Sequence, residues 1–282
     1  MKMRVFQSLW AMKGLPFAGE EWAIWEKVVA IQAAGFDGLD VPWTPLQPYA
    51  EAADCARALG LPVGVTCFPT SVEHFTELLS QFHALEPRPR YLNIQPVPKV
   101  FSVSEGAELL RAWIELGTAA GFPVFIETHR DRMTTDLRFT LQLLDAVPEM
   151  RLTADLSHYV VGQEFAWPVG EENHALIRRI LARADSFHGR VASREQVQVS
   201  VSWEVHRQWL ELFLGWWEEG FRSWRDRANG GDELIFVTEL GPPNWYAITG
   251  PDGVELSDRW QEALLLKDRV TRLWYQLASA DT

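Results

Sequence analysis

Phe125-Ile126-Glu127-Thr128-His129 is the first of four short phrases that decide the fold. The other three are Leu152-Thr153-Ala154-Asp155-Leu156-Ser157-His158, Phe187-His188-Gly189-Arg190 and Phe236-Val237-Thr238-Glu239-Leu240. Each begins as an apolar run typical of a buried strand, and each presents a carboxylate or an imidazole near its carboxyl end. Charged groups at the ends of buried strands are costly unless a ligand requires them. The phrases therefore predict parallel strands whose ends together form a site.

Outward from these phrases, short strand patterns alternate with longer helical patterns. The pattern predicts strands at residues 5–12, 38–43, 62–68, 91–97, 123–129, 151–159, 186–192 and 233–240. The clearest helical patterns cover residues 50–59, 72–85, 105–120, 137–147 and 175–184. Gly60 and Gly121 stand where two of these helices should end, and a proline follows each at a strand start.

Eight alternations over 282 residues match the length of a (β/α)8 TIM barrel, so we predict one α/β domain over residues 1–282. A doubly wound open sheet is the alternative, but no glycine-rich phosphate loop follows the first strand. The longest connection, residues 192–232, should hold an active-site loop and then a long tryptophan-rich helix.

Composition limits the function classes. The net charge of −12 disfavours a nucleic acid partner, because phosphate backbones repel such a chain. No apolar stretch approaches the length of a membrane span, and the start lacks the apolar core of a signal peptide. The two cysteines suggest neither a disulfide framework nor a zinc finger. We therefore expect no membrane association and a cytoplasmic location.

The carboxyl ends of barrel strands converge on one face, so the four phrases predict a metal site. Its ligands would be Glu127, Asp155, His188 and Glu239, from strands five to eight. Three oxygens and one imidazole nitrogen suit a single divalent ion, Mn²⁺, Zn²⁺, Co²⁺ or Mg²⁺. Taken singly, each residue could instead form an ion pair at a strand end.

Further candidates for substrate binding follow from position alone. His129 lies two residues beyond Glu127 and should face the same way, to contact either substrate or a ligand carboxylate. Asn93 and Gln95 share one face of the fourth strand and could meet sugar hydroxyls. Tryptophans near strand ends could stack on a sugar ring or plug the barrel rim. These are Trp10, Trp43 and Trp245.

A second group of tryptophans falls on the long helix of the 192–232 connection. Such a stripe is typical of helix packing or of a subunit interface. A homodimer or homotetramer is therefore a prediction of the sequence. The group comprises Trp203, Trp209, Trp216, Trp217 and Trp224.

Over its whole length the chain resembles the xylose-isomerase-like TIM-barrel superfamily of sugar isomerases and epimerases, which includes endonuclease IV. The phrases that carry the resemblance are Glu127-Thr128-His129, Asp155-x-x-His158, His188-x-Arg190 and Glu239. In the ketose 3-epimerase and inosose-processing branches, the residues matching the four ligands bind one divalent metal. The resemblance implies that His158 contacts substrate, that Arg190 helps to hold it, and that Glu127 and Glu239 are the acid–base pair.

The sequence thus predicts an isomerase or epimerase of a sugar or polyol ketone, which removes a proton next to the carbonyl and forms a metal-stabilised enediolate. A lyase or dehydratase with the same site is one alternative, and a non-catalytic sugar-binding barrel without stoichiometric metal is another. An endonuclease IV-like nuclease is disfavoured, because the third and fourth strands, Val65-Thr66-Cys67-Phe68 and Leu92-Asn93-Ile94-Gln95, carry no histidine. No glycine-rich or multi-arginine phosphate site is evident, which favours an unphosphorylated substrate.

Overall fold

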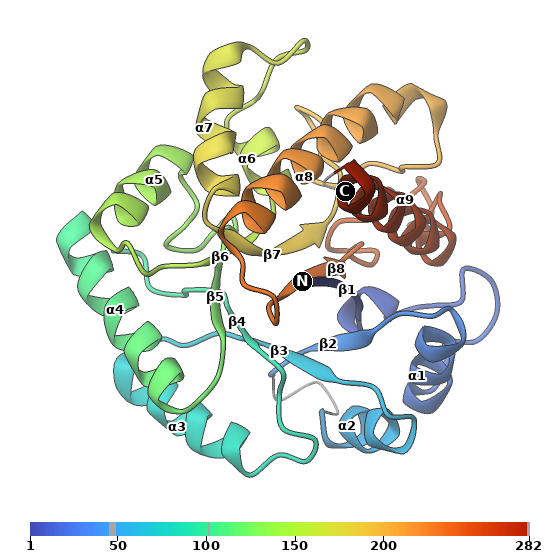
Figure 1. The fold of residues 1–282 in the computed structure, drawn as a ribbon. Helices are drawn as coiled ribbons and strands as arrows, with labels where there is room; N and C mark the ends of the chain where they lie inside the picture. Colours follow the sequence, from blue (N-terminus) through green and yellow to red (C-terminus); the bar gives the residue numbers. More distant parts are fainter. Residues whose placement is uncertain (45–48, 101, 281–282) are drawn as a thin grey trace.

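Eight parallel strands close into a barrel in the computed structural model, which describes residues 1–44, 49–100 and 102–280. Each strand pairs with the next along the chain, and β8 pairs with β1 to complete the ring (Figure 1). The strands are β1 (Lys2–Ser8), β2 (Gly38–Pro42), β3 (Val63–Cys67), β4 (Leu92–Ile94), β5 (Val124–Glu127), β6 (Leu152–Ala154), β7 (Ala184–Gly189) and β8 (Glu233–Thr238). The predicted (β/α)8 TIM barrel is confirmed.

Helices surround the strands on the outside of the ring (Figure 1). They are α1 (Ile24–Ala33), α2 (Tyr49–Ala58), α3 (Val72–His83), α4 (Val103–Ala119), α5 (Leu137–Ala146), α6 (Ser157–Gly162), α7 (Glu171–Leu181), α8 (Arg207–Arg227) and α9 (Arg259–Ala280), with short 3-10 helices at Trp10–Met12 and Glu204–His206. Gly60 and Gly121 have φ of +69° and +74°, the left-handed conformation that ends a helix. The two predicted helix ends are therefore confirmed.

The strand predictions were too long at their carboxyl ends, most of all for the first and sixth strands. Strand β1 ends at Ser8, and the 3-10 helix follows where the sequence suggested continued strand. Strand β6 ends at Ala154, because the Asp155 carboxylate accepts a 3.0 Å hydrogen bond from the backbone N–H of Ser157 and helix α6 begins there. The seventh strand covers 184–189 and not 186–192, so the preceding helix ends earlier than predicted, at Leu181.

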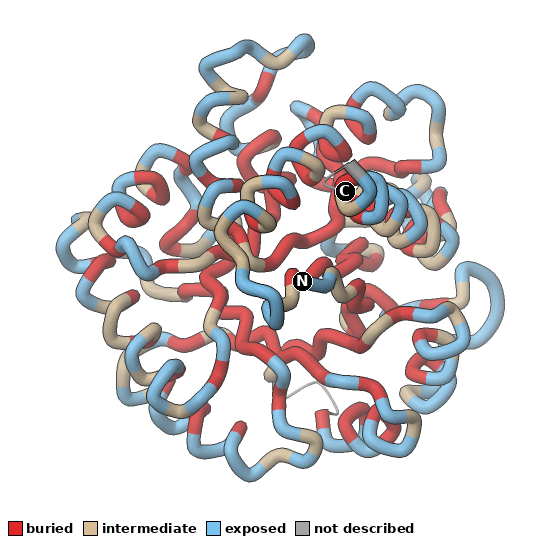
Figure 2. Tube along the Cα trace, in the orientation of Figure 1, coloured by how far each residue is buried: buried red, intermediate tan, exposed pale blue. Residues whose placement is uncertain are grey.

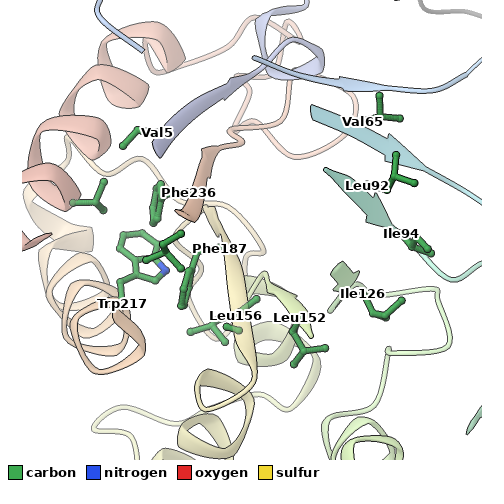
Figure 3. Close-up of a cluster of buried hydrophobic side chains, with 14 of the residues drawn as sticks. Val5, Val65, Leu92, Ile94, Ile126, Leu152, Leu156, Phe187, Trp217 and Phe236 are labelled. Atoms are coloured by element: carbon green, nitrogen blue, oxygen red, sulfur yellow. The ribbon is translucent and has the colours of Figure 1, made fainter. Parts of the chain in front are cut away.

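The hydrophobic core lies between the barrel and the helices. Figure 2 shows the strands as a buried ring, with the helices exposed on their outer sides. Trp217 of α8 meets the ring of Phe236 edge to face at 5.1 Å, and Figure 3 shows both beside Phe187 on the outward face of β7 and β8. The α8 tryptophans 209, 216, 217 and 224 are all buried here. The tryptophan stripe therefore serves internal packing, and an oligomer stays a prediction.

A separate apolar cluster fills the inside of the barrel. Phe6, Tyr91, Phe125, Ile235 and Val237 form it, each on the strand face opposite to the one that meets the helices. Gly38 and Gly64 leave the room for this cluster, since a Cβ at Gly64 would lie 2.2 Å from the Tyr91 ring. Asn93, Glu127 and Glu239 lie two residues beyond Tyr91, Phe125 and Val237 along the same inward faces. The cluster therefore lies directly beneath the side chains at the carboxyl end of the barrel.

Candidate metal centre and active site

The four predicted ligands meet at one point. One donor atom from each of Glu127, Asp155, His188 and Glu239 lies within 4.8 Å of the donors of the other three. They come from the neighbouring strands β5 to β8, as the ring order requires (Figure 1). Glu239 is 7% exposed and the other three are at most 1% exposed. Three carboxylates this close in a dry interior need a cation between them.

His188 supplies the test of whether a metal fits. Its Nδ1 lies 2.9 Å from Glu239 Oε2, 3.6 Å from Glu127 Oε1 and 3.9 Å from Asp155 Oδ2. The atom is buried, yet it makes no hydrogen bond of acceptable geometry. Burial would lower the pKa of His188, but the surrounding carboxylates raise it to about 10. The positive charge that this pocket favours can be supplied by a divalent ion, and three carboxylate oxygens with one imidazole nitrogen are a fitting donor set.

The two glutamates differ in their environments. Glu127 accepts hydrogen bonds from Asn93 Nδ2 at 2.6 Å and Gln95 Nε2 at 3.2 Å. Burial raises the pKa of Glu127, and the nearby carboxylates of Glu239 and Asp155 raise it further. Burial would also raise the pKa of Glu239, but His188 and Arg190 hold it well below the usual range. The two glutamates of the cluster therefore have pKa values moved in opposite directions by their neighbours.

Arg190 holds the ligand carboxylates in place. Its Nη1 donates to Asp155 Oδ2 at 2.9 Å, and its Nη2 donates to Glu239 Oε2 at 2.7 Å. Its Nε donates to the backbone carbonyl of Glu239 at 3.0 Å. The side chain is 1% exposed, although it forms part of the cavity wall. Most donors of this arginine are therefore used by the site itself.

His129 and His158 lie side by side, but only His129 lines the cavity. Their ring centroids lie 4.1 Å apart, and the side chain of His158 is fully buried, whereas His129 lines the cavity. The Nδ1 of His129 donates to the backbone carbonyl of Arg130, so its Nε2 accepts from the Tyr246 hydroxyl at 3.2 Å. Burial lowers the pKa of His129 to about 3, which keeps the ring neutral. In this conformation His129, and not His158, faces substrate space.

The site opens into a cavity of about 690 Å³, large enough for a sugar-sized ligand. Five of the predicted site residues line it, namely Gln95, Trp10, Trp245, Arg190 and Glu239. Trp10 and Trp245 meet edge to face at 6.3 Å on its wall.

Two predicted substrate contacts lie outside this wall. Asn93 is fully buried beneath it and binds Glu127 instead. Trp43 is not among the described residues that line the cavity, and its ring packs on Tyr49 and Phe82. Trp43 thus packs against neighbouring aromatic rings, and its contact with substrate stays a prediction.

Asp40 and Tyr246 are among the cavity residues that the sequence analysis missed. Asp40 of β2 is 1% exposed and accepts hydrogen bonds from Thr66 Oγ1 at 2.7 Å and Tyr91 Oη at 2.9 Å. Burial raises its pKa. Asp40 is a carboxylate near the end of a buried strand. The pattern that marked the four predicted ligands therefore marked Asp40 as well. Tyr246 lies in the loop after β8, where no periodic pattern marks a residue.

Comparisons with known proteins find similarity to solved structures. No family model and no curated protein sequence matches the chain. An L-ribulose 3-epimerase structure is similar with a TM-score of 0.61 and 14% identity, covering 99% of this chain and 97% of that one.

Two further structures are similar to this chain over nearly its whole length. D-allulose 3-epimerase from Methylomonas sp. in complex with D-allulose has a TM-score of 0.58 and 12% identity, covering 96% and 97%. A xylose isomerase-like TIM barrel protein from Mycobacterium smegmatis in complex with magnesium has a TM-score of 0.60 and 11% identity, covering 96% and 98%. The chain therefore has the fold of the ketose 3-epimerases and of the xylose isomerase-like barrels, as the resemblance predicted.

Proposed function

We propose that this chain is an isomerase or epimerase of a sugar or polyol ketone that depends on one divalent metal ion. The observation that carries the proposal is the buried His188 Nδ1, which faces three carboxylates without a hydrogen bond. The similar structures support it at the level of the fold, and two of them are named as ketose 3-epimerases.

Glu127, Asp155, His188 and Glu239 would hold the metal. When bound there, a divalent ion supplies Lewis-acid polarisation of a substrate carbonyl and stabilises the negative charge that develops on its oxygen. Because the four side chains are almost completely buried, the local dielectric constant is low and the electrostatic contribution is large.

The protein's own proton transfers would fall to the two glutamates. We assign Glu239 as the carboxylate that accepts the proton next to the carbonyl. We assign Glu127 as the carboxylate that returns a proton to the substrate. Asn93 and Gln95 fix the orientation of Glu127, and Arg190 fixes that of Glu239. His129 and Gln95 on the cavity wall would bind substrate hydroxyls.

The experiment that tests this proposal is solvent deuterium exchange in metal-loaded protein. A panel of keto-sugars is incubated in D₂O, and mass spectrometry follows the label. Incorporation of one deuterium without loss of water is expected of an isomerase or epimerase. Incorporation with loss of water would indicate the lyase alternative. Stoichiometric metal without exchange into any ketose would contradict the proposed reaction.

A further inference from the structure

The cavity above the metal ligands contains more positive charge than the proposed chemistry uses. In a chain of net charge −12, five of its lining residues are cationic: Lys13, Lys27, Arg130, Arg132 and Arg190. Arg190 is used by Asp155 and Glu239, and Lys27 is paired with Glu21. The remaining three are Lys13 and, on the loop after β5, Arg130 and Arg132. The proposed chemistry gives them no role.

Arg132 is fixed close to the metal ligands. Its Nε donates to Gln95 Oε1 at 3.1 Å, and the same Gln95 side chain donates to Glu127. Its Nη1 donates to the backbone carbonyl of Asp131 at 2.9 Å. No described residue accepts a hydrogen bond from its Nη2. The guanidinium is therefore held one side chain away from Glu127, with donor capacity left over.

Arg130 forms the neighbouring part of the wall. Its guanidinium lies 4.7 Å from the centroid of the Tyr246 ring, which orients it over the cavity. No described carboxylate lies within ion-pair distance of Arg130. The carboxylate between the two arginines, Asp131, is paired with Lys99 and lies 3.6 Å from Arg132 Nη1. Asp131 therefore leaves much of the positive charge at this rim available.

We infer that the substrate carries an oxyanion, either a carboxylate or a phosphate monoester, which Arg130 and Arg132 bind at the cavity wall. The inference rests on the proposed function, because that function fixes the reacting carbons at the Glu127 and Glu239 end. Planar guanidinium groups match the oxygens of both anions and form charge-assisted hydrogen bonds with them. The sequence favoured an unphosphorylated substrate because no glycine-rich or multi-arginine phosphate site was evident in it. In the folded chain Lys13, Arg130 and Arg132 line the same cavity.

The test compares three ligands that differ only at carbon 6: D-fructose, D-fructuronate and D-fructose 6-phosphate. Their dissociation constants for metal-loaded protein are measured by isothermal titration calorimetry. At least one anion should bind about tenfold or more tightly than D-fructose, as charge-assisted hydrogen bonds require. The arm that gains affinity identifies the carboxylate or the phosphate as the preferred oxyanion.

Arg130→Gln should remove most of that preference by lowering the affinity for the anion. The matched control is Arg138→Gln, which also removes one charge but acts on an exposed arginine paired with Glu172. This control should keep the full preference. Equal affinity for all three ligands, or an equal effect of the two variants, would overturn the inference.

The outcomes also separate the inference from the proposed function. Anion preference without deuterium exchange would leave the oxyanion site in place and reject the isomerase. Exchange into neutral ketoses without anion preference would keep the isomerase and reject the oxyanion site.

Discussion

The two ends of β8 each present an inward-facing glutamate to arginine, with very different surroundings. Glu233, at the start of the strand, accepts hydrogen bonds from Arg4 at 3.0 Å and from Arg90, across the barrel, at 2.6 Å. Glu239, just beyond the end, accepts from Arg190 at 2.7 Å but also faces His188 and two more carboxylates.

The difference lies in what each cluster still lacks. Around Glu233, hydrogen bonds with Arg4 and Arg90 lower its pKa against the opposing effect of burial, and its side chain stays 17% exposed. Around Glu239, acidic groups gather in a dry interior beside a histidine nitrogen without a hydrogen bond. The Glu233 carboxylate has a hydrogen-bonded partner on each side, whereas the Glu239 cluster could still hold a cation. We therefore propose that the first charge cluster is structural and that the second is functional.

The largest expected effect comes from changing the two glutamates in the same way. Glu239→Gln should lower turnover by about 10²–10⁴-fold, because it removes both a metal ligand and the proposed proton acceptor. Glu233→Gln is the matched control, and its turnover should stay close to wild type. Steady-state kinetics on an active ketose provides the measurement. Comparable losses in the two variants would mean that the ends of β8 do not differ in function.

Removal of metal should distinguish the two ends by stability. Chelation should lower the melting temperature by roughly 5 °C or more, since a ligand at a hundred times its Kd stabilises by about 2.7 kcal/mol. Glu233→Gln should keep this shift, and Glu239→Gln should lose most of it. Differential scanning fluorimetry with and without chelator is sufficient. A shift that survives in Glu239→Gln would place the metal elsewhere.

A smaller effect should follow when one hydrogen-bond donor is removed from the candidate metal site or from the Glu233 cluster. Asn93→Ala removes the 2.6 Å hydrogen bond that Asn93 donates to Glu127. We expect kcat to fall about tenfold, which corresponds to the free energy of one hydrogen bond to a buried charge. Arg90→Gln takes two hydrogen bonds from Glu233, at 3.2 and 2.6 Å, and should leave kcat unchanged. Unchanged kcat in Asn93→Ala would show that Glu127 needs no such orientation.

The smallest expected effect is on the pH dependence of stability, and it concerns Glu233 at the start of β8. Arg90 and Arg4 lower the pKa of Glu233 in the folded chain against the effect of burial, so its ionised form favours folding. That contribution is complete above the unfolded pKa of about 4.3 and is lost as pH falls through the lower folded value. Glu233→Gln should therefore cost about 1 kcal/mol near pH 7, with the gap narrowing below about pH 5. Urea unfolding across that range measures it, and a gap that widens in acid would have the wrong sign.

Much of the fold and of the metal site could be predicted because they depend on short-range patterns. Apolar runs followed by Glu127, Asp155, His188 and Glu239 mark strand ends, and a closed ring leaves those ends only one common face. Alternation also explains Trp43, since Gly38, Asp40 and Pro42 point inward and the next side chain points to the helices.

The remainder depends on loops and on packing between distant segments. His158 lies behind His129 because β6 ends at Ala154 and a helix begins at Ser157, which turns that side chain away from the strand direction. Tyr246 and Arg130 come from different loops and meet only in the folded chain. No periodicity in the sequence encodes such contacts, which is why the cavity wall was the least predictable part.

Elemental analysis of the purified protein, after dialysis against each candidate metal, tests the central claim most directly. The account predicts one divalent ion per chain in the wild type and in Glu233→Gln, and close to none in His188→Gln. Absence of stoichiometric metal from the wild type, or full retention by His188→Gln, would contradict it.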